Sequence, residues 1–460
     1  MFEAPPDLRT AEVPQVCLDS SHLPGLRASG LRTNNLLIRS ARFTGSLQLA
    51  YTEIAGVCDL SETSLRTGDR QALSAPSLRV GKDLSLAGLL AESSTAAPAV
   101  DLTSSAISGN VTMVRTAAVN RHGAAISLRR ATVGDCVTLI DACARGAIDL
   151  DGIVVGKNIT FRGSTLLGVL WLEDARVGLN VLIYGAHLRN VGKLALKADR
   201  ADVGGSFHIR SGTEIIGAVS IRSTSIGSQL SVVDSTIVRT GPADSICLAR
   251  TKLGRSLEMP LSVLLSSKDF TAHLDGLSYP DPPLGEGDWL ELLTRYSTTY
   301  QPQAYQQLAT VHRAAGHEQY ARKVLIAQQK DLGRRGDPGN RLWHRFLGVT
   351  LAYGYKPSRA VSGLLATFVL ALSLVWTADA HNGLTPAKDR PADSCSPVNR
   401  ISLAADLAIP LVKLGGTPRC ELANGPAGQW ATGAGWVVQI LGWSFATLSV
   451  AGFTGLVRKS

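Results

Sequence analysis

Residues 155–183 read VGKNITFRGSTLLGVLWLEDARVGLNVLI, and the spacing of the apolar residues in this stretch decides the fold. Ile159, Leu170 and Val181 lie 11 residues apart, and each is followed two positions later by another apolar residue. Such an apolar–x–apolar unit is typical of a short strand with one buried face. The unit occurs nineteen times, with its first residue at Leu36, Leu47, Cys58, Leu73, Leu84, Val100, Val111, Ile126, Val137, Ile148, Ile159, Leu170, Val181, Leu196, Phe207, Val219, Leu230, Ile246 and Leu257.

The steps between these positions indicate that the full repeat contains two units. Most steps are 11 residues, and every longer step follows an odd-numbered unit. The odd-numbered units from Cys58 onward also have an apolar residue four positions earlier, which glycine follows in seven of nine cases. We therefore predict a mainly β protein, a right-handed parallel β-helix with 22-residue coils over residues 31–260, after an N-terminal cap over 1–30. We expect the glycines to supply positive φ at the corners of the coils.

The insertions point to the functional part of the solenoid, because binding residues concentrate on loops held by a rigid scaffold. Five insertions lie at residues 66–71, 91–99, 119–124, 189–194 and 239–245, all predicted at one corner. Several are basic, so a ligand strip along this edge and ordinary solvated loop tips are the two alternatives. The candidate binding residues are Arg66, Arg70, Arg121, His122, Arg189, Lys193 and Arg239.

Known catalytic and cofactor motifs are missing from the sequence. It contains no GxGxxG, P-loop, HExxH or GxSxG motif and no CxxC spacing. Without such motifs, the sequence leaves open whether the chain is an enzyme and predicts neither a cofactor nor a metal site.

Charged residues make up 18% of the chain, below the roughly 25% of soluble proteins. The N-terminus lacks the features of a cleaved signal peptide.

After a linker over 261–287, residues 288–360 have the pattern of a helical juxtamembrane region. Residues 302–335 predict a helical hairpin turning at Gly316, similar to one tetratricopeptide repeat, which we expect to cap or dock on the solenoid. Residues 301–360 hold ten Lys and Arg against three acidic residues, which favours contact with an anionic inner leaflet over nucleic-acid binding. An interfacial helix is expected at residues 342–351.

Two apolar stretches are long enough to be transmembrane helices, at residues 361–378 and 433–457. Basic residues precede the first stretch and follow the second, whereas the extracytoplasmic loop between them, over 379–432, has five basic and five acidic residues. The positive-inside rule therefore predicts a protein of the cytoplasmic membrane with both termini in the cytoplasm. Cys395 and Cys420 fall in that loop, as a disulfide or as two free thiols.

The order of the segments resembles a family of actinobacterial membrane proteins with pentapeptide-like cytoplasmic repeats. The resemblance covers nearly the whole chain and is most specific in the last 160 residues, which include YQQLATVHRAAGHEQYARKVLIAQQ (305–329) and the final AGFTGLVRK (451–459). Members are often labelled membrane-associated oxidoreductases. The resemblance implies that activity and a redox cofactor of unknown identity, but it transfers no catalytic residue.

Three functions follow from these observations. The first is a membrane-anchored cytoplasmic scaffold or sensor, whose solenoid edge binds a protein or ligand partner; a homo-oligomer is compatible with it. The second is the membrane-associated oxidoreductase that the family label implies. The third is a two-span channel in which residues 401–414 re-enter the membrane, against the alternative of an interfacial helix outside.

Overall fold

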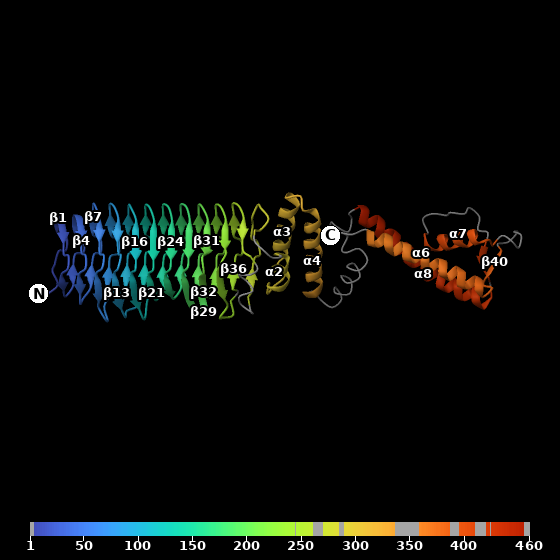
Figure 1. Cartoon of the computed structure of the whole chain (residues 1–460), viewed down its shortest axis with the longest axis horizontal. Helices are drawn as coiled ribbons and strands as arrows, with labels where there is room; N and C mark the ends of the chain where they lie inside the picture. Colours follow the sequence, from blue (N-terminus) through green and yellow to red (C-terminus); the bar gives the residue numbers. More distant parts are fainter. Residues whose placement is uncertain are drawn as a thin grey trace. The chain divides into compact units, whose positions relative to one another are not determined.

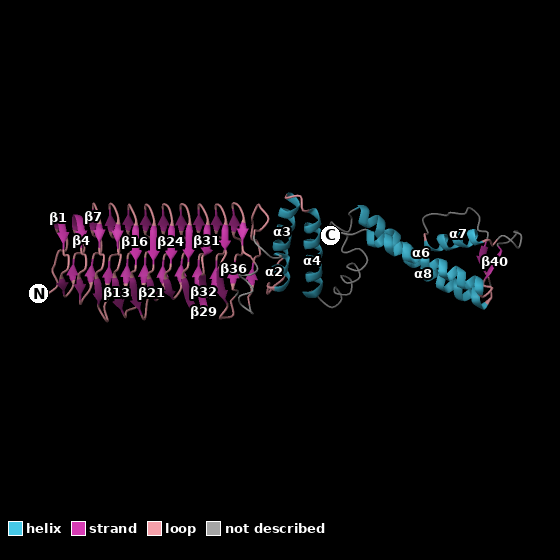
Figure 2. Ribbon diagram, viewed as in Figure 1, coloured by secondary structure: helices cyan, strands magenta, loops and turns pink. Residues whose placement is uncertain are grey.

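The structure, a computed structural model, describes residues 4–243, 245–260, 270–284, 289–335, 358–386, 395–409, 420–423 and 425–454. The chain divides into two compact units, Met1–Val324 and Leu325–Ser460. Figure 1 shows the strands of the first unit following one another along a single axis, and Figure 2 shows helices after the last coil and throughout most of the second unit. Each unit is described separately below.

The first unit is a parallel β-solenoid of about ten turns, as the repeat predicts. One of its two large sheets has 20 strands: β1 (Glu12–Cys17), β4 (Arg32–Leu37), β7 (Glu53–Ile54), β8 (Cys58–Asp59), β11 (Arg79–Val80), β12 (Leu84–Ser85), β15 (Ala106–Ile107), β16 (Val111–Val114), β19 (Thr132–Val133), β20 (Val137–Ile140), β23 (Val154–Val155), β24 (Ile159–Arg162), β27 (Arg176–Val177), β28 (Val181–Tyr184), β30 (Asp202–Val203), β31 (Phe207–Arg210), β33 (Ser225–Ile226), β34 (Leu230–Val232), β37 (Lys252–Leu253) and β38 (Leu257–Glu258).

The other large sheet has 19 strands: β2 (His22–Leu23), β3 (Leu26–Arg27), β5 (Arg42–Phe43), β6 (Leu47–Gln48), β9 (Ser64–Arg66), β10 (Leu73–Ser74), β13 (Leu90–Ser93), β14 (Val100–Asp101), β17 (Ala117–Asn120), β18 (Ile126–Ser127), β21 (Cys143–Arg145), β22 (Ile148–Asp149), β25 (Thr165–Leu167), β26 (Leu170–Trp171), β29 (His187–Lys197), β32 (Thr213–Ser220), β35 (Ser235–Val238), β36 (Ile246–Cys247) and β39 (Ala272–His273). Pairing thus extends beyond residues 31–260 at both ends.

Strand register confirms the two-unit repeat. Odd-numbered units pair with one another, as in Ile159 with Val181, and even-numbered units do the same, as in Ile148 with Leu170. All nineteen repeat positions are at most 2% exposed. Their side chains fill the interior of the coils, and this aliphatic column is the core of the unit.

The glycines after the apolar residue of odd-numbered units correct one expectation. Gly156, Gly178 and Gly227 do not have positive φ. Other glycines do, such as Gly146 and Gly217 shortly before repeat strands, and so do several serine, aspartate and arginine residues. Instead, a Cβ on Gly156 would lie 1.9 Å from the carbonyl oxygen of Gly134 in the preceding coil. Glycine is required there because the backbones of successive coils approach too closely for any side chain.

Helices follow the last coil. They are α2 (Trp289–Arg295), α3 (Pro302–Ala314) and α4 (Glu318–Arg335), and the predicted turn of the hairpin lies at Gly316, with φ +81°. Gln301, just before α3, accepts a hydrogen bond from the backbone N–H of Leu274 at 2.7 Å and donates one to the carbonyl of Ala272 at 3.2 Å. The start of α3 therefore caps strand β39, as expected for a hairpin that docks on the solenoid.

The second unit contains α6 (Ser358–Ala380), α7 (Pro397–Ala408), α8 (Pro426–Thr454) and an antiparallel strand pair, β40 (Leu384–Pro386) and β41 (Cys420–Leu422). Both α6 and α8 are long and apolar enough to cross a membrane. Many of their apolar side chains are exposed, among them Leu365, Val369, Trp436 and Ile440. The interfacial helix predicted at residues 342–351 lies outside the described residues.

Candidate functional site

The inserted segments lie where the repeat predicts, next to strands of the 19-stranded sheet. Three of them connect consecutive strands of that sheet, from β9 to β10, from β13 to β14 and from β17 to β18. A fourth lies within β29 as an irregularity in its pairing with β32, and the fifth connects β35 to β36. We call these five segments together the loop corner.

The loop corner consists of two groups of loops rather than one continuous strip. In the first group, the Asn120 amide donates to the carbonyl of Ala97 at 2.7 Å, and the Gln71 amide donates to that of Pro98 at 3.0 Å. In the second, the backbone N–H of Gly192 donates to the Thr240 hydroxyl at 2.9 Å. The coils between them turn without an insertion, at Gly146, where φ is +125°.

The sequence-predicted binding residues divide between these groups. The first group has four of them, all exposed: Arg66, Arg70, Arg121 and His122. Of these, Arg66 lies 3.9 Å from the Glu92 carboxylate. The second group has Arg189 and Lys193, both exposed, and Arg239, which is only partly exposed.

Arg239 has a structural role in its own loop. Its guanidinium donates hydrogen bonds to the carbonyls of Gly241, Pro242 and Ala243 at 3.0 to 3.1 Å. These bonds satisfy loop carbonyls that no strand pairs. The other six predicted residues therefore remain the candidate contacts for a partner, namely Arg66, Arg70, Arg121, His122, Arg189 and Lys193. Arg239 holds the shape of the surface beside them.

A groove of about 800 Å³, which the repeat pattern did not predict, adjoins the first loop of the loop corner. We call it the N-terminal groove; its lining includes His22, Ser40, Arg42, Thr44, Glu62, Thr63, Ser64, Arg66 and Leu90. Strand register places His22, Arg42 and Ser64 side by side on neighbouring coils. Phe43 and Leu23, which alternate with them, are also among the lining residues but are almost fully buried.

A second groove, of about 880 Å³, lies on the 20-stranded sheet, and its charges cancel. Glu12, Arg32, Glu53 and Arg79 follow one another there on successive coils. The Arg32 guanidinium lies 3.0 Å from Glu12 and 3.4 Å from Glu53, and the Arg79 guanidinium lies 3.8 Å from Glu53. We call this the ladder groove, because opposite charges alternate along it.

A polar cluster on β28, β31, β34 and β38 is structural. The Arg210 guanidinium donates to the Ser231 hydroxyl at 2.7 Å and to the Glu258 carboxylate at 2.5 Å, and the Tyr184 hydroxyl lies 2.9 Å from Nδ1 of His208. Burial, together with the positive charge of Arg210, lowers the pKa of His208. Ser231 is fully buried, so its hydroxyl is closed to a substrate.

Metal-ligating residues do not gather in the described part of the chain: no three His, Cys, Asp or Glu side chains there are arranged to hold an ion. The cysteines of the solenoid are also dispersed. Cys58 is buried, Cys17 is exposed, and Cys136, Cys143 and Cys247 are intermediate. Neither observation supports a redox centre within these residues.

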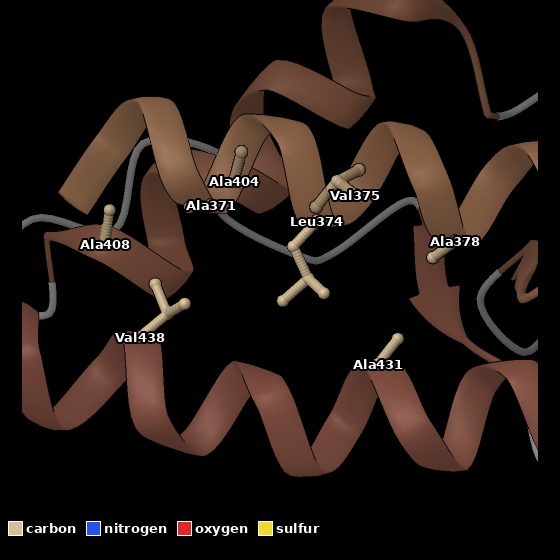
Figure 3. Packing of buried hydrophobic residues seen from close by; sticks show 8 residues of the cluster. All are labelled: Ala371, Leu374, Val375, Ala378, Ala404, Ala408, Ala431 and Val438. Atoms are coloured by element: carbon tan, nitrogen blue, oxygen red, sulfur yellow. The ribbon is translucent and has the colours of Figure 1, made fainter. Parts of the chain in front are cut away.

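The second unit has a disulfide between Cys395 and Cys420, with a Cα–Cα distance of 5.4 Å. The bond connects the residue just before α7 to strand β41. Ala404, Ala405 and Ala408 of α7 are buried, and a common cluster contains Ala404 and Ala408 with Ala371 and Val375 of α6 and Val438 of α8 (Figure 3). The N-terminal part of α7 is held to the end of α6 by an ion pair between Arg400 and Asp379 at 2.6 Å.

Comparisons with protein-family models, with curated proteins and with solved structures give no match to this chain.

Proposed function

We propose that this chain is a membrane-anchored scaffold or sensor whose solenoid binds a protein or ligand partner at the loop corner. The observation that carries the proposal is the loop corner itself, where exposed basic side chains extend from a rigid stack of coils. A repeated backbone holds such loops at fixed spacing, so a partner can engage several of them without ordering the scaffold. The two long apolar helices supply the anchor.

The proposed orientation has both termini in the cytoplasm and the connection between α6 and α8 outside. The Cys395–Cys420 disulfide supports it, because disulfides persist in oxidising compartments and are rare in the cytosol. Trp376, near the end of α6, and Trp430, near the start of α8, are both exposed. Tryptophan is enriched at membrane–water interfaces, so this pair would mark the outer boundary.

Thiol labelling of intact cells tests the orientation. A membrane-impermeant maleimide should label Cys395 and Cys420 only after reduction by a reductant that stays outside the cell. The double variant Cys395→Ser/Cys420→Ser, which retains the five other cysteines, should take up no label under the same conditions. Labelling of that variant in intact cells would place the solenoid cysteines outside and overturn the proposed orientation.

Site-specific photo-crosslinking tests the loop corner as the partner site. A photoreactive residue at His122 should yield a discrete adduct in membranes, and Arg121→Ala or Lys193→Ala should reduce its yield because each removes a charge from the corner. The matched control places the photoreactive residue at Asp202, which is exposed on the 20-stranded sheet. An adduct that forms equally from both positions would contradict the proposal.

A second candidate function, a two-span channel, is favoured by the depth of α7. Val438 of α8 lies eight residues after Trp430, which corresponds to a depth of about 12 Å below the proposed outer boundary. Because Ala408 packs in the cluster that includes Val438, the C-terminal end of α7 would enter the bilayer rather than lie on its surface. The negative end of a helix dipole at that depth would favour cations.

Recording from the purified full chain in planar bilayers tests the channel. We expect cation-selective openings, altered by Ala408→Trp at the buried end of α7 and unaffected by Val398→Trp at its exposed start. A silent bilayer containing folded protein would remove this candidate and leave the scaffold proposal intact.

The oxidoreductase activity implied by the family resemblance stays a third proposal, and the described residues lend it no support. A visible absorbance spectrum with native mass spectrometry of the purified full chain tests it. A flavin, haem or nicotinamide mass would favour the oxidoreductase over the scaffold.

A further inference from the structure

We infer that the N-terminal groove binds the phosphate group of a small ligand through Arg42 and Arg66. The inference rests on the proposed function in treating the solenoid as a binding module, and it names a ligand chemistry for a site that adjoins the loop corner.

Register brings the basic side chains together. His22, Arg42 and Ser64 occupy matching outward positions on consecutive coils, which are about 4.8 Å apart. Arg66 lies two residues after Ser64 and therefore on the same face of β9. From these spacings the Cα atoms of Arg42 and Arg66 are about 8 Å apart, a separation that two long guanidinium side chains can bridge around one tetrahedral anion.

The charge of Arg42 is not neutralised by the protein. Within the described residues, the side chain of Arg42 has neither a hydrogen bond nor an ion pair, and the same holds for the side chain of His22. Arg66 has only the distant Glu92, with 3.9 Å between nitrogen and oxygen. The groove thus has two guanidinium groups with unused donors on one face.

The carboxylate of Glu62, which lines the N-terminal groove, pairs with an arginine outside the groove rather than with Arg42 or Arg66. Glu62 lies 3.5 Å from the guanidinium of Arg115, which is not one of the groove-lining residues. Donors for the other oxygens of a phosphate are available from the lining hydroxyls of Ser64 and Thr44. Guanidinium groups suit phosphate because their planar fork donates two parallel hydrogen bonds.

The ladder groove shows that size alone does not create this chemistry. Both grooves have similar volumes and lie on outward faces of neighbouring coils. In the ladder groove, however, each arginine lies beside a glutamate on a neighbouring coil and forms an ion pair with it. Arg79 of that groove is therefore a matched control, since its loss changes the net charge by the same amount as loss of Arg42.

The volume of the groove indicates a ligand larger than a bare ion, because about 800 Å³ is within the range of sites for small organic ligands. Pro24 and Leu90 line the groove and are only partly buried, so they offer such a ligand apolar contact. The phosphate could belong to a free phosphate ester or to a lipid headgroup. The shared chemistry is a phosphate monoester, and the experiment separates the two sources.

Isothermal titration calorimetry of the full chain in neutral detergent tests the inference, with inorganic phosphate, glycerol 3-phosphate and dihexanoyl phosphatidic acid as probes. We expect saturable binding of phosphate that sulfate displaces. A charge-assisted hydrogen bond contributes about 1.5–3 kcal/mol, so Arg42→Gln and Arg66→Gln should each weaken binding by about tenfold or more. Arg79→Gln should leave binding unchanged. Tighter binding of phosphatidic acid than of glycerol 3-phosphate would identify the headgroup as the source, and the reverse order would identify a free ester.

Two results would overturn the inference: no saturable binding of any probe, or binding that Arg42→Gln and Arg66→Gln leave as tight as in the parent chain. Far-UV circular dichroism of both variants controls for folding, and because both side chains are exposed we expect parent spectra. The outcome is separable from the scaffold proposal. If the N-terminal groove binds no probe while the His122 crosslink still depends on Arg121, the inference is wrong and the scaffold proposal stands. If phosphate binds but no crosslink forms, the inference stands and the scaffold proposal is contradicted.

Discussion

At the residue scale, a column of glycines lies where successive coils leave no room for a side chain. Gly134, Gly156, Gly178, Gly204 and Gly227 occupy the same corner of successive coils, and a Cβ on each of the last four would fall within 2.3 Å of the carbonyl oxygen of the preceding glycine. A contact so short must be relieved by moving backbone, not by rotating a side chain. This column therefore specifies how tightly the coils stack.

Gly227→Ala should destabilise the solenoid by about 1–3 kcal/mol, because the new methyl group would lie 2.1 Å from the Gly204 carbonyl oxygen. Thermal and urea unfolding followed by far-UV circular dichroism measure the change. Ser225→Ala, at the exposed start of strand β33 just before Gly227, is the control and should change stability little. Equal unfolding midpoints for the two variants would show that the corner has room.

A second residue-scale feature is the buried carboxylate of Asp199, which is 3% exposed. Desolvation alone would raise its pKa, but hydrogen bonds from the Ser220 hydroxyl at 2.6 Å and from the backbone and guanidinium of Arg222 outweigh this effect and lower the pKa. The ionised form is therefore the one that stabilises the fold. That contribution is present above the unfolded pKa of about 3.9 and is lost as pH falls through the lower folded pKa.

Asp199→Asn should lower stability at pH 7 by about 1–3 kcal/mol, since it removes charge-assisted hydrogen bonds from a buried site. The difference from the parent chain should begin to shrink as the pH falls below about 4, the unfolded pKa, and should be lost below the lower folded pKa, where the carboxyl group is neutral in both states. Urea unfolding across this pH range measures it, with the exposed Asp202→Asn as control. A stability difference that stays constant with pH would contradict the role of the charge.

At the element scale, the end of the solenoid is closed by a side chain and not by another strand. Gln301 is 2% exposed and bonds both to the N–H of Leu274 and to the carbonyl of Ala272, as a further strand would. An unpaired strand edge is a template for association with other chains. The helical hairpin thus protects the edge of β39 and gives the solenoid a defined last coil.

Gln301→Ala should expose that edge. Two buried backbone groups would lose their partners, at about 1–3 kcal/mol for each unsatisfied group. Hydrogen–deuterium exchange of peptides covering residues 272–274 should accelerate, whereas peptides from the central coils should not change. The control is Gln303→Ala, because Gln303 is exposed on the first turn of α3. Unchanged exchange in the Gln301 variant would mean that other groups close the edge.

At the scale of the whole molecule, the two units distribute apolar residues in opposite ways. In the solenoid most large apolar side chains are inside, and the nineteen repeat positions are at most 2% exposed. In the second unit, α6 and α8 expose residues such as Leu365, Trp436 and Ile440. An exposed apolar surface is stable in lipid and a liability in water, so the two units are suited to different solvents.

A chain that ends after Arg335 should therefore be recovered in the soluble fraction, because it lacks α6 and α8. Fractionation followed by far-UV circular dichroism checks both its location and its β content. The full chain, fractionated in parallel, should stay with the membranes after an alkaline carbonate wash. Retention of the shortened chain in the membrane would indicate that residues before α6 contribute an anchor of their own.

How much of this could be predicted follows from how local each feature is. Strand positions such as Ile159 and Val181 were predictable because burial of one face imposes a period of two and coil stacking repeats it every 22 residues. The helical turn at Gly316 and the two apolar helices were predictable because each also depends on a local pattern, helical periodicity in one case and the length of an apolar run in the other. The N-terminal groove was not, because His22 and Arg42 are twenty residues apart and only register makes them neighbours. The role of Gln301 likewise depends on which strand end the hairpin reaches.

The sequence by itself thus determined the class of fold, the repeat length and order of its coils, the corner from which loops leave, and the two helices long and apolar enough to span a membrane. These properties depend on the spacing of apolar and small residues along the chain, which is a one-dimensional quantity. Tertiary structure alone decided which charges are paired, as in the ladder groove, and which are left unpaired, as at Arg42. It also decided that the glycine column from Gly134 to Gly227 serves close packing, whereas other corner glycines such as Gly146 have positive φ. The physical reason is that pairing, burial and steric room depend on distances between coils, which no repeat length specifies.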